Sequence, residues 1–437
     1  MRPNTDTQHK RQGKPLHRSS AWDGMGSPRA NKLVLARFVW VGLSIGCAQA
    51  WADGTPSSAS TASSLAPAPP SLQPALVGAL TANPKPMSYD AGPLGKVYVT
   101  GVASGLAQWQ TNVVPGDYGG QRDLSNGQLF LNKPDGLVQF FLQVGVYSLP
   151  DLGVPYVRSD TATSAFYGPF AQGYLKLAPN DSFSIEAGKL PTLIGAESTF
   201  SFQNLNIQRG LLWNQENAVN RGVQVNYTKG SLALSASWND GLYSNKWSWA
   251  WLSATWTFDK SNTLALIGSG NTTRTTVSTT ATPLVLNNEQ LYNLIYTHTA
   301  GQWTFEPYLQ YTHVPRTPEI GALQDASTYG AALLMNYACP SNGQIGGLKL
   351  AGVSLPVRVE YIASSGNAAN GAPNLLYGPG SRAWSISVTP TYQYNAFFAR
   401  TEFSYVGTSD TSPGFVFGPN GTDKTQTRAL LEFGIVF

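Results

Sequence analysis

Apolar and polar residues alternate one by one along most of this chain from about residue 97 to its end. In residues 137–147, for example, Gln139 separates Val138 from Phe140, and Gln143 follows Leu142. Because successive side chains of a β-strand point to opposite faces, this period of two predicts strands with one apolar and one polar face. The sequence therefore predicts an all-β fold. The pattern returns in residues 222–228, 303–312, 396–406 and 427–437.

The connections between these segments are of two kinds. Tight polar turns, such as residues 133–136 and 229–231, are typical of β-hairpins. Longer segments rich in Gly, Asn, Ser and Thr, such as 149–168 and 271–287, lie between the hairpins. Short turns at one end and long loops at the other are the arrangement of bacterial outer-membrane barrels.

We therefore predict a transmembrane antiparallel up-and-down β-barrel of about 16 strands, with about 14 or 18 as the alternatives. An even number returns both chain ends to the periplasmic side. Segment 126–132 and the long connection 339–354 fit the pattern least well. The predicted strands are 97–107, 126–132, 137–148, 169–177, 182–189, 222–228, 231–239, 247–258, 262–270, 289–299, 302–312, 327–338, 355–363, 383–392, 396–406 and 427–437.

The composition favours a barrel over other membrane proteins. Only 12% of the residues are charged, and the chain holds 12 Trp, 20 Tyr and 18 Phe. An ordinary soluble domain has roughly a quarter of its residues charged. After residue 52 no apolar run is long enough for a membrane-spanning helix, which excludes a helical membrane protein. Alternating strands average to neutral hydropathy, so a barrel stays compatible with this sequence.

Residues 1–52 have the features of a signal peptide. Arg29, Lys32 and Arg37 precede a short apolar run that ends in small residues at Ala48–Ala50 and Ala50–Ala52. Translation from Met25 would give a leader of ordinary length. Eight of the 28 basic residues but only two of the 24 acidic ones lie in this leader, so the remaining chain is slightly acidic. The basic balance of the precursor therefore gives no indication of a nucleic-acid partner.

Residues 53–94 are rich in Ala, Ser, Pro and Thr and carry few large apolar groups. We expect a flexible segment there, ahead of a barrel over 95–437, because such a composition buries little surface.

The last strand is the most specific feature of the barrel. Phe433, Ile435 and Phe437 alternate with other residues up to the final position, as in a signal recognised by the barrel-assembly machinery. A soluble β-sandwich is the alternative.

Several stretches resemble a known family. They read AGKLPTLIGAES at 187–198, NLNIQRG at 204–210, NRGVQVNY at 220–227, WNDG at 238–241 and FEPYLQY at 305–311. Together they resemble the OmpL-like porin-2 barrels of Gram-negative bacteria, over about residues 97–437. The resemblance implies an outer-membrane porin, a water-filled channel for passive diffusion of small hydrophilic solutes or ions, and brings no catalytic residues. The expected partners are outer-membrane lipid and lipopolysaccharide, the assembly machinery, small solutes and further copies in a homotrimer.

A barrel of this size needs something to narrow it. Sixteen strands about 4.8 Å apart and tilted near 40° give a backbone diameter of about 32 Å, which side chains alone do not fill. The longest hairpin loop, 190–221, is the candidate constriction, and an external loop lying over its own strands is the alternative. Its charged residues are Glu197, Arg209, Glu216 and Arg221.

Charged residues on the polar faces of the strands are the candidate pore lining, where they would discriminate among solutes. Opposite charges two or four positions apart share a face of their strand, so the alternative is a ladder of ion pairs that stiffens the wall. The candidates are Lys176, Glu186, Glu306, Arg358, Glu360, Arg400, Glu402, Arg428 and Glu432.

Two other functions are alternatives to a channel. A barrel enzyme would have few candidate catalytic residues. Beyond the leader the chain has only His298 and His313 and no Ser/His/acid spacing that stands out. An adhesin or a structural wall is the second alternative. Cys339 is the one cysteine outside the leader, so no disulfide, Cys-based metal site or cofactor is expected.

Overall fold

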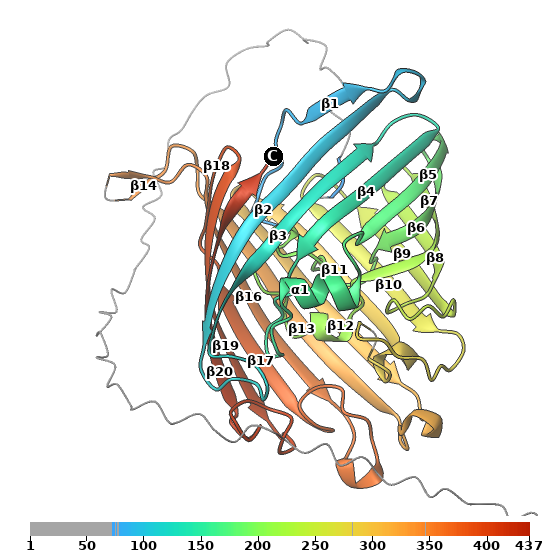
Figure 1. Cartoon of the computed structure of the whole chain (residues 1–437), viewed down its shortest axis with the longest axis vertical. Coiled ribbons are helices and arrows are strands. Elements are labelled where there is room, and N and C mark those ends of the chain that lie inside the picture. The colour runs from blue at the N-terminus through green and yellow to red at the C-terminus, as the bar shows by residue number, and fades with distance from the viewer. Residues whose placement is uncertain (1–71, 75, 77, 282, 346) are drawn as a thin grey trace, which may run out of the picture. The chain divides into compact units, whose positions relative to one another are not determined.

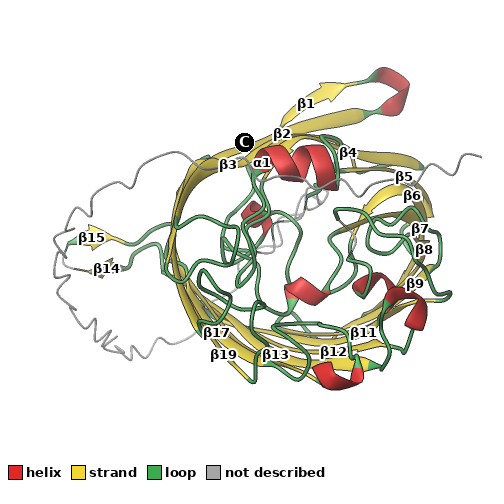
Figure 2. Cartoon of the chain, turned by 60° about the horizontal axis from the view of Figure 1, so that its bottom comes forward, coloured by secondary structure: helices red, strands yellow, loops and turns green. Residues whose placement is uncertain are grey.

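The computed structural model describes residues 72–74, 76, 78–281, 283–345 and 347–437. These residues form a closed antiparallel β-barrel of 16 strand positions, which confirms the predicted fold class and strand number (Figures 1 and 2). β1 (Met87–Asp90) is a short addition to the edge of β2, and β17 and β18 are consecutive halves of one barrel position. The predicted signal peptide and the start at Met25 lie outside the described residues.

The strands of the wall follow one another around the barrel in chain order. They are β2 (Lys96–Gln110), β3 (Gly120–Lys133), β4 (Val138–Tyr147), β5 (Gln172–Asn180), β6 (Phe183–Pro191), β7 (Val219–Lys229), β8 (Leu232–Asn239), β9 (Trp249–Thr257), β10 (Asn262–Asn271), β11 (Gln290–Ala300), β12 (Trp303–Val314), β13 (Ala326–Ala338), β16 (Val353–Ser364), β17 (Arg382–Val388), β18 (Thr391–Tyr394), β19 (Phe397–Ser409) and β20 (Thr425–Val436).

The first and last strands of the wall close the barrel. β2 pairs with β20 from Val102↔Val436 to Gln110↔Arg428. The terminal residue extends this seam, because Phe437 N–H donates to Gly101 O at 3.0 Å and Gly101 N–H donates to Phe437 O at 2.8 Å. A Cβ atom on Gly101 would lie 2.4 Å from the Phe437 ring, so any larger residue at this position would clash with the ring.

The connections follow the predicted alternation, with two differences. β3 begins at Gly120 instead of residue 126, because β2 pairs with these polar residues as far as Trp109↔Gly120. The long connection between β13 and β16 contains a two-stranded hairpin, β14 (Gln344–Ile345) with β15 (Leu348–Lys349). It lies at the same end of the barrel as the short turns and the C-terminus (Figure 1).

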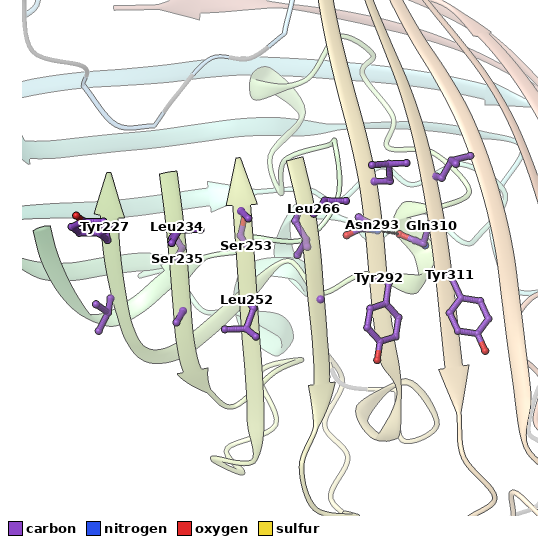
Figure 3. Close-up of a pocket in the computed structure, with 17 residues that line it drawn as sticks. Tyr227, Leu234, Ser235, Leu252, Ser253, Leu266, Tyr292, Asn293, Gln310 and Tyr311 are labelled. Atoms are coloured by element: carbon purple, nitrogen blue, oxygen red, sulfur yellow. Dashed lines mark hydrogen bonds between the residues drawn. The ribbon is translucent and has the colours of Figure 1, made fainter. Parts of the chain in front are cut away.

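The outer wall is apolar and the inner wall polar, as alternation predicts. Val144 and Leu252 point outward and are 49% and 64% exposed, whereas Gln143 points inward and is fully buried. A shallow hollow of about 910 Å³ over β7 to β12 belongs to the outer wall, where Leu252 and Tyr292 lie on its surface (Figure 3). In a bilayer this hollow faces acyl chains, so it is not the channel. Within the described part of the chain, no helix has both the length and the apolar character to traverse a bilayer.

Part of the segment expected to be flexible is folded onto the barrel. β1 pairs with the start of β2, from Met87↔Val99 to Asp90↔Lys96. Further upstream, Leu80 is 2% exposed and belongs to a buried cluster with residues of the wall. Leu76 and Leu80 lie among Ala, Pro and Gly without the one-by-one alternation of a strand, so alternation could not detect this contact.

Candidate functional site

The connection between β6 and β7, residues 192–218, folds into the barrel, and we call it the lumen loop (Figure 2). Five large apolar side chains of this loop are at most 1% exposed, and burial of each contributes roughly 1.5–3 kcal/mol. An external loop would leave this surface in water. The lumen loop is therefore the segment that crosses the interior, as the constriction hypothesis requires. The five side chains are Phe200, Phe202, Ile207, Leu211 and Leu212.

Two charged residues of β16 hold the middle of the lumen loop. Arg358 donates to Glu197 Oε1 at 2.6 Å and to the main-chain oxygen of Gln208 at 2.7 Å. The Glu360 carboxylate accepts from the backbone N–H groups of Leu211 and Leu212, at 3.0 and 3.2 Å. The same carboxylate also accepts from Arg358 Nε at 3.1 Å, so the two wall residues form one unit.

Two further charged residues, on β19, hold the first half of the loop. Arg400 donates at 3.1 Å to the main-chain oxygens of both Ser201 and Asn204, and it is ion-paired with Glu432 on β20. Glu402 accepts from the backbone N–H groups of Ile207 and Gln208 at 2.5 and 3.2 Å. Arg400 is 1% exposed and Glu402 is fully buried. We call β16, β19 and β20 the anchoring wall.

A second loop, between β4 and β5, is tied into the same network. Arg428 of β20 donates to the main-chain oxygens of Asp151 and Val154, at 2.6 and 2.5 Å. Arg209 of the lumen loop donates from Nε to Asp151 Oδ1 at 2.5 Å and lies 5.3 Å from the Trp213 ring. Asp151 therefore links the two loops.

Next to the anchoring wall, and separated from β16 only by β13, the strands β12 and β11 also contact the loop. The Gln310 side chain donates to Leu212 O at 2.9 Å, and Gly195 N–H donates to Asn293 Oδ1 at 3.1 Å. Tyr308 donates its hydroxyl to Glu216 Oε1, while the other oxygen of this carboxylate is buried without a hydrogen-bond partner. The loop, which leaves β6 and returns to β7, is thus fixed along the facing part of the wall from β11 to β20.

Two acids of the lumen loop have unusual protonation behaviour. Burial raises the pKa of Glu216 to about 8, and the neighbouring Tyr308 hydrogen bond opposes this only in part. Burial also raises the pKa of Glu197 to about 7, although Arg358 stabilises the ionised form. Glu216 is the less compensated of the two, because only the Tyr308 hydrogen bond lowers its pKa, whereas two arginines, Arg358 and Arg209, lower that of Glu197.

The six charged residues predicted on β16, β19 and β20 do point to the lumen. Their side chains, however, are at most 2% exposed, because the lumen loop and the loop before β5 cover them. This corrects the expectation that they face open water. The Arg358–Glu360 and Arg400–Glu432 pairs of the ladder alternative are formed, and loop backbone supplies their remaining partners. The six residues are Arg358, Glu360, Arg400, Glu402, Arg428 and Glu432.

The other predicted residues lie outside this anchor. Lys176 on β5 and Glu186 on β6 form an ion pair of 3.3 Å across their hairpin, and the Lys176 side chain is 31% exposed. Glu306 on β12 accepts from the Thr297 hydroxyl at 2.9 Å. Arg221 does not belong to the loop, because β7 begins at Val219; it pairs with Asp240 at 2.8 Å.

Sequence reasoning missed the uncharged and loop partners of the site. Asp151, Tyr308 and Asn293 contact the lumen loop across separations of 58, 92 and 98 residues. Alternation places Tyr308 and Asn293 on the inner face of their strands, and that is the signal by which they could have been found. Nothing in the local sequence indicates which loop atoms they meet.

A cavity of about 350 Å³ remains between the lumen loop and the wall. Residues 191–199 and 203–205 form one side of it, and Ile295, Thr304, Glu306 and Asn336 of β11 to β13 form the other. Its lining mixes polar and apolar groups. The interior of the barrel is therefore narrowed on the side of the anchoring wall and hollow next to β11 to β13.

An apolar outer wall, a polar lumen and a loop fixed across that lumen define an outer-membrane channel. Residues 96–437 match the family described as "Putative beta-barrel porin-2, OmpL-like", and the chain belongs to this family. This confirms the resemblance seen in the sequence, and the protein is located in the outer membrane. No curated protein matches the chain in sequence.

Solved structures confirm the fold. In-vitro folded OmpT, an outer membrane protein of Vibrio cholerae, aligns with a TM-score of 0.50 at 11% identity, over 79% of this chain and 98% of its own. The outer membrane channel DcaP of Acinetobacter baumannii aligns with a TM-score of 0.51 at 9% identity, over 78% of this chain and 97% of its own. At these identities the likeness concerns the fold alone.

Proposed function

We propose that this porin is a passive diffusion channel for small hydrophilic solutes in which the lumen loop sets the size limit. The observation that carries the proposal is that this loop leaves β6, is hydrogen-bonded to β12, β16 and β19 on the facing part of the wall, and returns to β7, so that it spans the lumen. A loop fixed in this way holds the same cross-section while solutes pass. The space beside β11 to β13 offers polar groups for a hydrated solute.

We propose different roles for the two groups of charges. The six buried charges of the anchoring wall fix the loop and shape the path indirectly. The more exposed Lys176–Glu186 pair on the inner wall acts on permeating ions directly.

Reconstitution of the purified barrel tests the function. We expect stepwise ion conductance in planar bilayers and swelling of liposomes in small sugars and amino acids, with a cut-off that moves when the loop is released. Absence of conductance from a barrel that is folded, as judged by its shift on unheated gels, would overturn the proposal.

The family and the fold point to a channel rather than to an enzyme. We propose further that the chain has no catalytic activity, that it assembles as a homotrimer, and that its contacts include lipopolysaccharide and the assembly machinery. Chemical crosslinking in detergent would test the trimer, and a monomer under all conditions would exclude it.

A further inference from the structure

Residues 78–83, which we call the N-terminal segment, lie inside the mouth of the barrel at the end of the short turns. This is the end where β1, β18 and the C-terminus lie (Figure 1). Leu80 is 2% exposed and shares a buried apolar cluster with inward-facing residues of three strands and of the lumen loop. They are Val102 of β2, Phe130 of β3, Phe398 of β19 and Phe202 of the loop.

The N-terminal segment lies directly against the lumen loop. A Cβ atom on Gly78 would be 2.2 Å from the main-chain carbonyl of Asn204, so the two backbones touch. Gly78 also lines the cavity between the lumen loop and β11 to β13. The segment therefore forms part of the boundary of the space through which solutes would leave the barrel.

A glutamine at the end of β18 fixes the segment at its other side. Thr81 N–H donates to Gln393 Oε1 at 2.7 Å, and Gln393 Nε2 donates to Thr81 O at 2.9 Å. The Thr81 hydroxyl also donates to Gln393 Oε1 at 3.2 Å, and all three bonds are exposed to solvent. The buried Leu80, the partly buried Leu76 and three exposed hydrogen bonds involve no ion pair, so this attachment is weaker than the ionic network of the lumen loop.

The barrel does not depend on this attachment. The wall is hydrogen-bonded all the way round by β2 to β20, and none of these pairings involves residues 78–83. The segment can therefore leave its seat while the wall and the lumen loop keep their structure.

We propose that the N-terminal segment is a reversible plug that lowers conductance through the periplasmic mouth when Leu80 is seated. This inference rests on the proposed channel function and adds a regulation to it. The sequence has no charged residue from Gly54 to Pro84, so the transmembrane potential exerts no direct force on the plug. Opening is therefore independent of the sign of the applied voltage.

The test compares Leu80→Asp with the parent chain in planar bilayers. Burial of an unpaired carboxylate among apolar side chains is costly, so we expect the N-terminal segment of this variant to leave the mouth of the barrel. The mean conductance should then rise at least twofold at both polarities. Leu94→Asp is the matched control, because Leu94 is 55% exposed in the hairpin between β1 and β2. We expect it to conduct like the parent.

A labelling experiment measures seating without conductance. Leu80→Cys, in a Cys339→Ser background, should react slowly with a water-soluble maleimide in the folded barrel and faster when Gln393→Ala is added. Equal conductance of the parent and Leu80→Asp, or equally fast labelling with and without Gln393→Ala, would overturn the plug alone. Absence of conductance from both the parent and the Leu80→Asp barrel would overturn the proposed channel function as well.

Discussion

Arg358 on β16 and Glu197 in the lumen loop form an ion pair of 2.6 Å between residues 161 positions apart in the sequence. The Arg358 side chain is fully buried and that of Glu197 is 8% exposed. A buried pair of this kind contributes little net stability when both partners are present, but leaves an uncompensated charge when one is removed. The pair is therefore better understood as a device that fixes where the loop lies.

Arg358→Gln should loosen the attachment of the lumen loop to β16, where only Glu360 would still hold it. Both Glu197 and Glu360 lose their basic partner, and removal of one member of a buried pair costs about 3–5 kcal/mol. We expect the barrel to form, the loop to become sensitive to protease, and the single-channel conductance to rise. Arg382→Gln is the control, since its pair with Asp410 at 3.5 Å is more than half exposed on both sides and contributes about 0–1 kcal/mol. Equal behaviour of the two variants would contradict the anchoring role.

The docking of the lumen loop should weaken as pH rises. The pKa of Glu216 is raised from 4.5 to about 8 in the folded state, so the docked loop binds a proton that the released loop gives up. The stabilisation is fully present below pH 4.5 and is lost as the pH passes 8. Channel noise and protease sensitivity of the loop should therefore increase between these values. Glu216→Gln keeps the volume and removes the titration, and a pH profile unchanged by this substitution would refute the assignment.

Glu186→Gln should shift the ion preference of the channel toward anions. The substitution frees Lys176, whose side chain is 31% exposed on the inner wall, from its pair. Because the pair is partly solvated, the free energy of unfolding should change by less than about 1 kcal/mol. The reversal potential under a salt gradient measures the preference, and a urea series measures stability. Glu319→Gln in the exposed turn Pro318–Ile320 removes the same charge away from the lumen and should leave the potential unchanged.

Assembly should depend on the contact between Phe437 and Gly101. Deletion of Phe437 removes a ring and two backbone hydrogen bonds from the closing seam, and Gly101→Val displaces the ring by steric overlap. Both variants should give less heat-modifiable barrel in the outer membrane, the deletion the least. Gly105→Val is the control on the same strand, since its Cβ would meet no atom closer than 3.9 Å. Parental yields of the Phe437 deletion would show that the final residue is dispensable.

Alternation located the strands well because each strand faces lipid on one side and the polar lumen on the other. β10 at Asn262–Asn271 and β13 at Ala326–Ala338 lie within one residue of their predicted bounds. The start of β3 was missed for the same reason, because Gln121 to Asp123 are polar on both faces and only pairing with β2 keeps them extended. Alternation identifies strand residues that face lipid on one side of the wall. It gives no signal for the parts of strands that extend beyond the bilayer.

The site was predictable in its residue types and less so in its contacts. The charges of β16 and β19 were placed on the inner face correctly, since that follows from strand period alone. Their burial was not foreseen, because it depends on where a loop 150 to 200 positions away comes to lie, as for Arg358 with Gln208 and Arg400 with Ser201. The buried position of Leu80 likewise depends on tertiary contacts, which produce no periodic pattern in the sequence.

Glu432 has a consequence for the order of assembly. Its carboxylate on the last strand accepts from Ser104 on the first strand at 3.1 Å and from Ser201 of the lumen loop at 3.3 Å, besides Arg400. The receptor surface for this part of the loop therefore comes into existence only when the two ends of the wall meet. The contacts of β16 and β19 with the loop do not involve this seam, so closure of the wall adds the Glu432 contacts to a loop that other strands also hold. A single carboxylate thereby couples the pairing of the two ends of the wall to the position of the first part of the lumen loop.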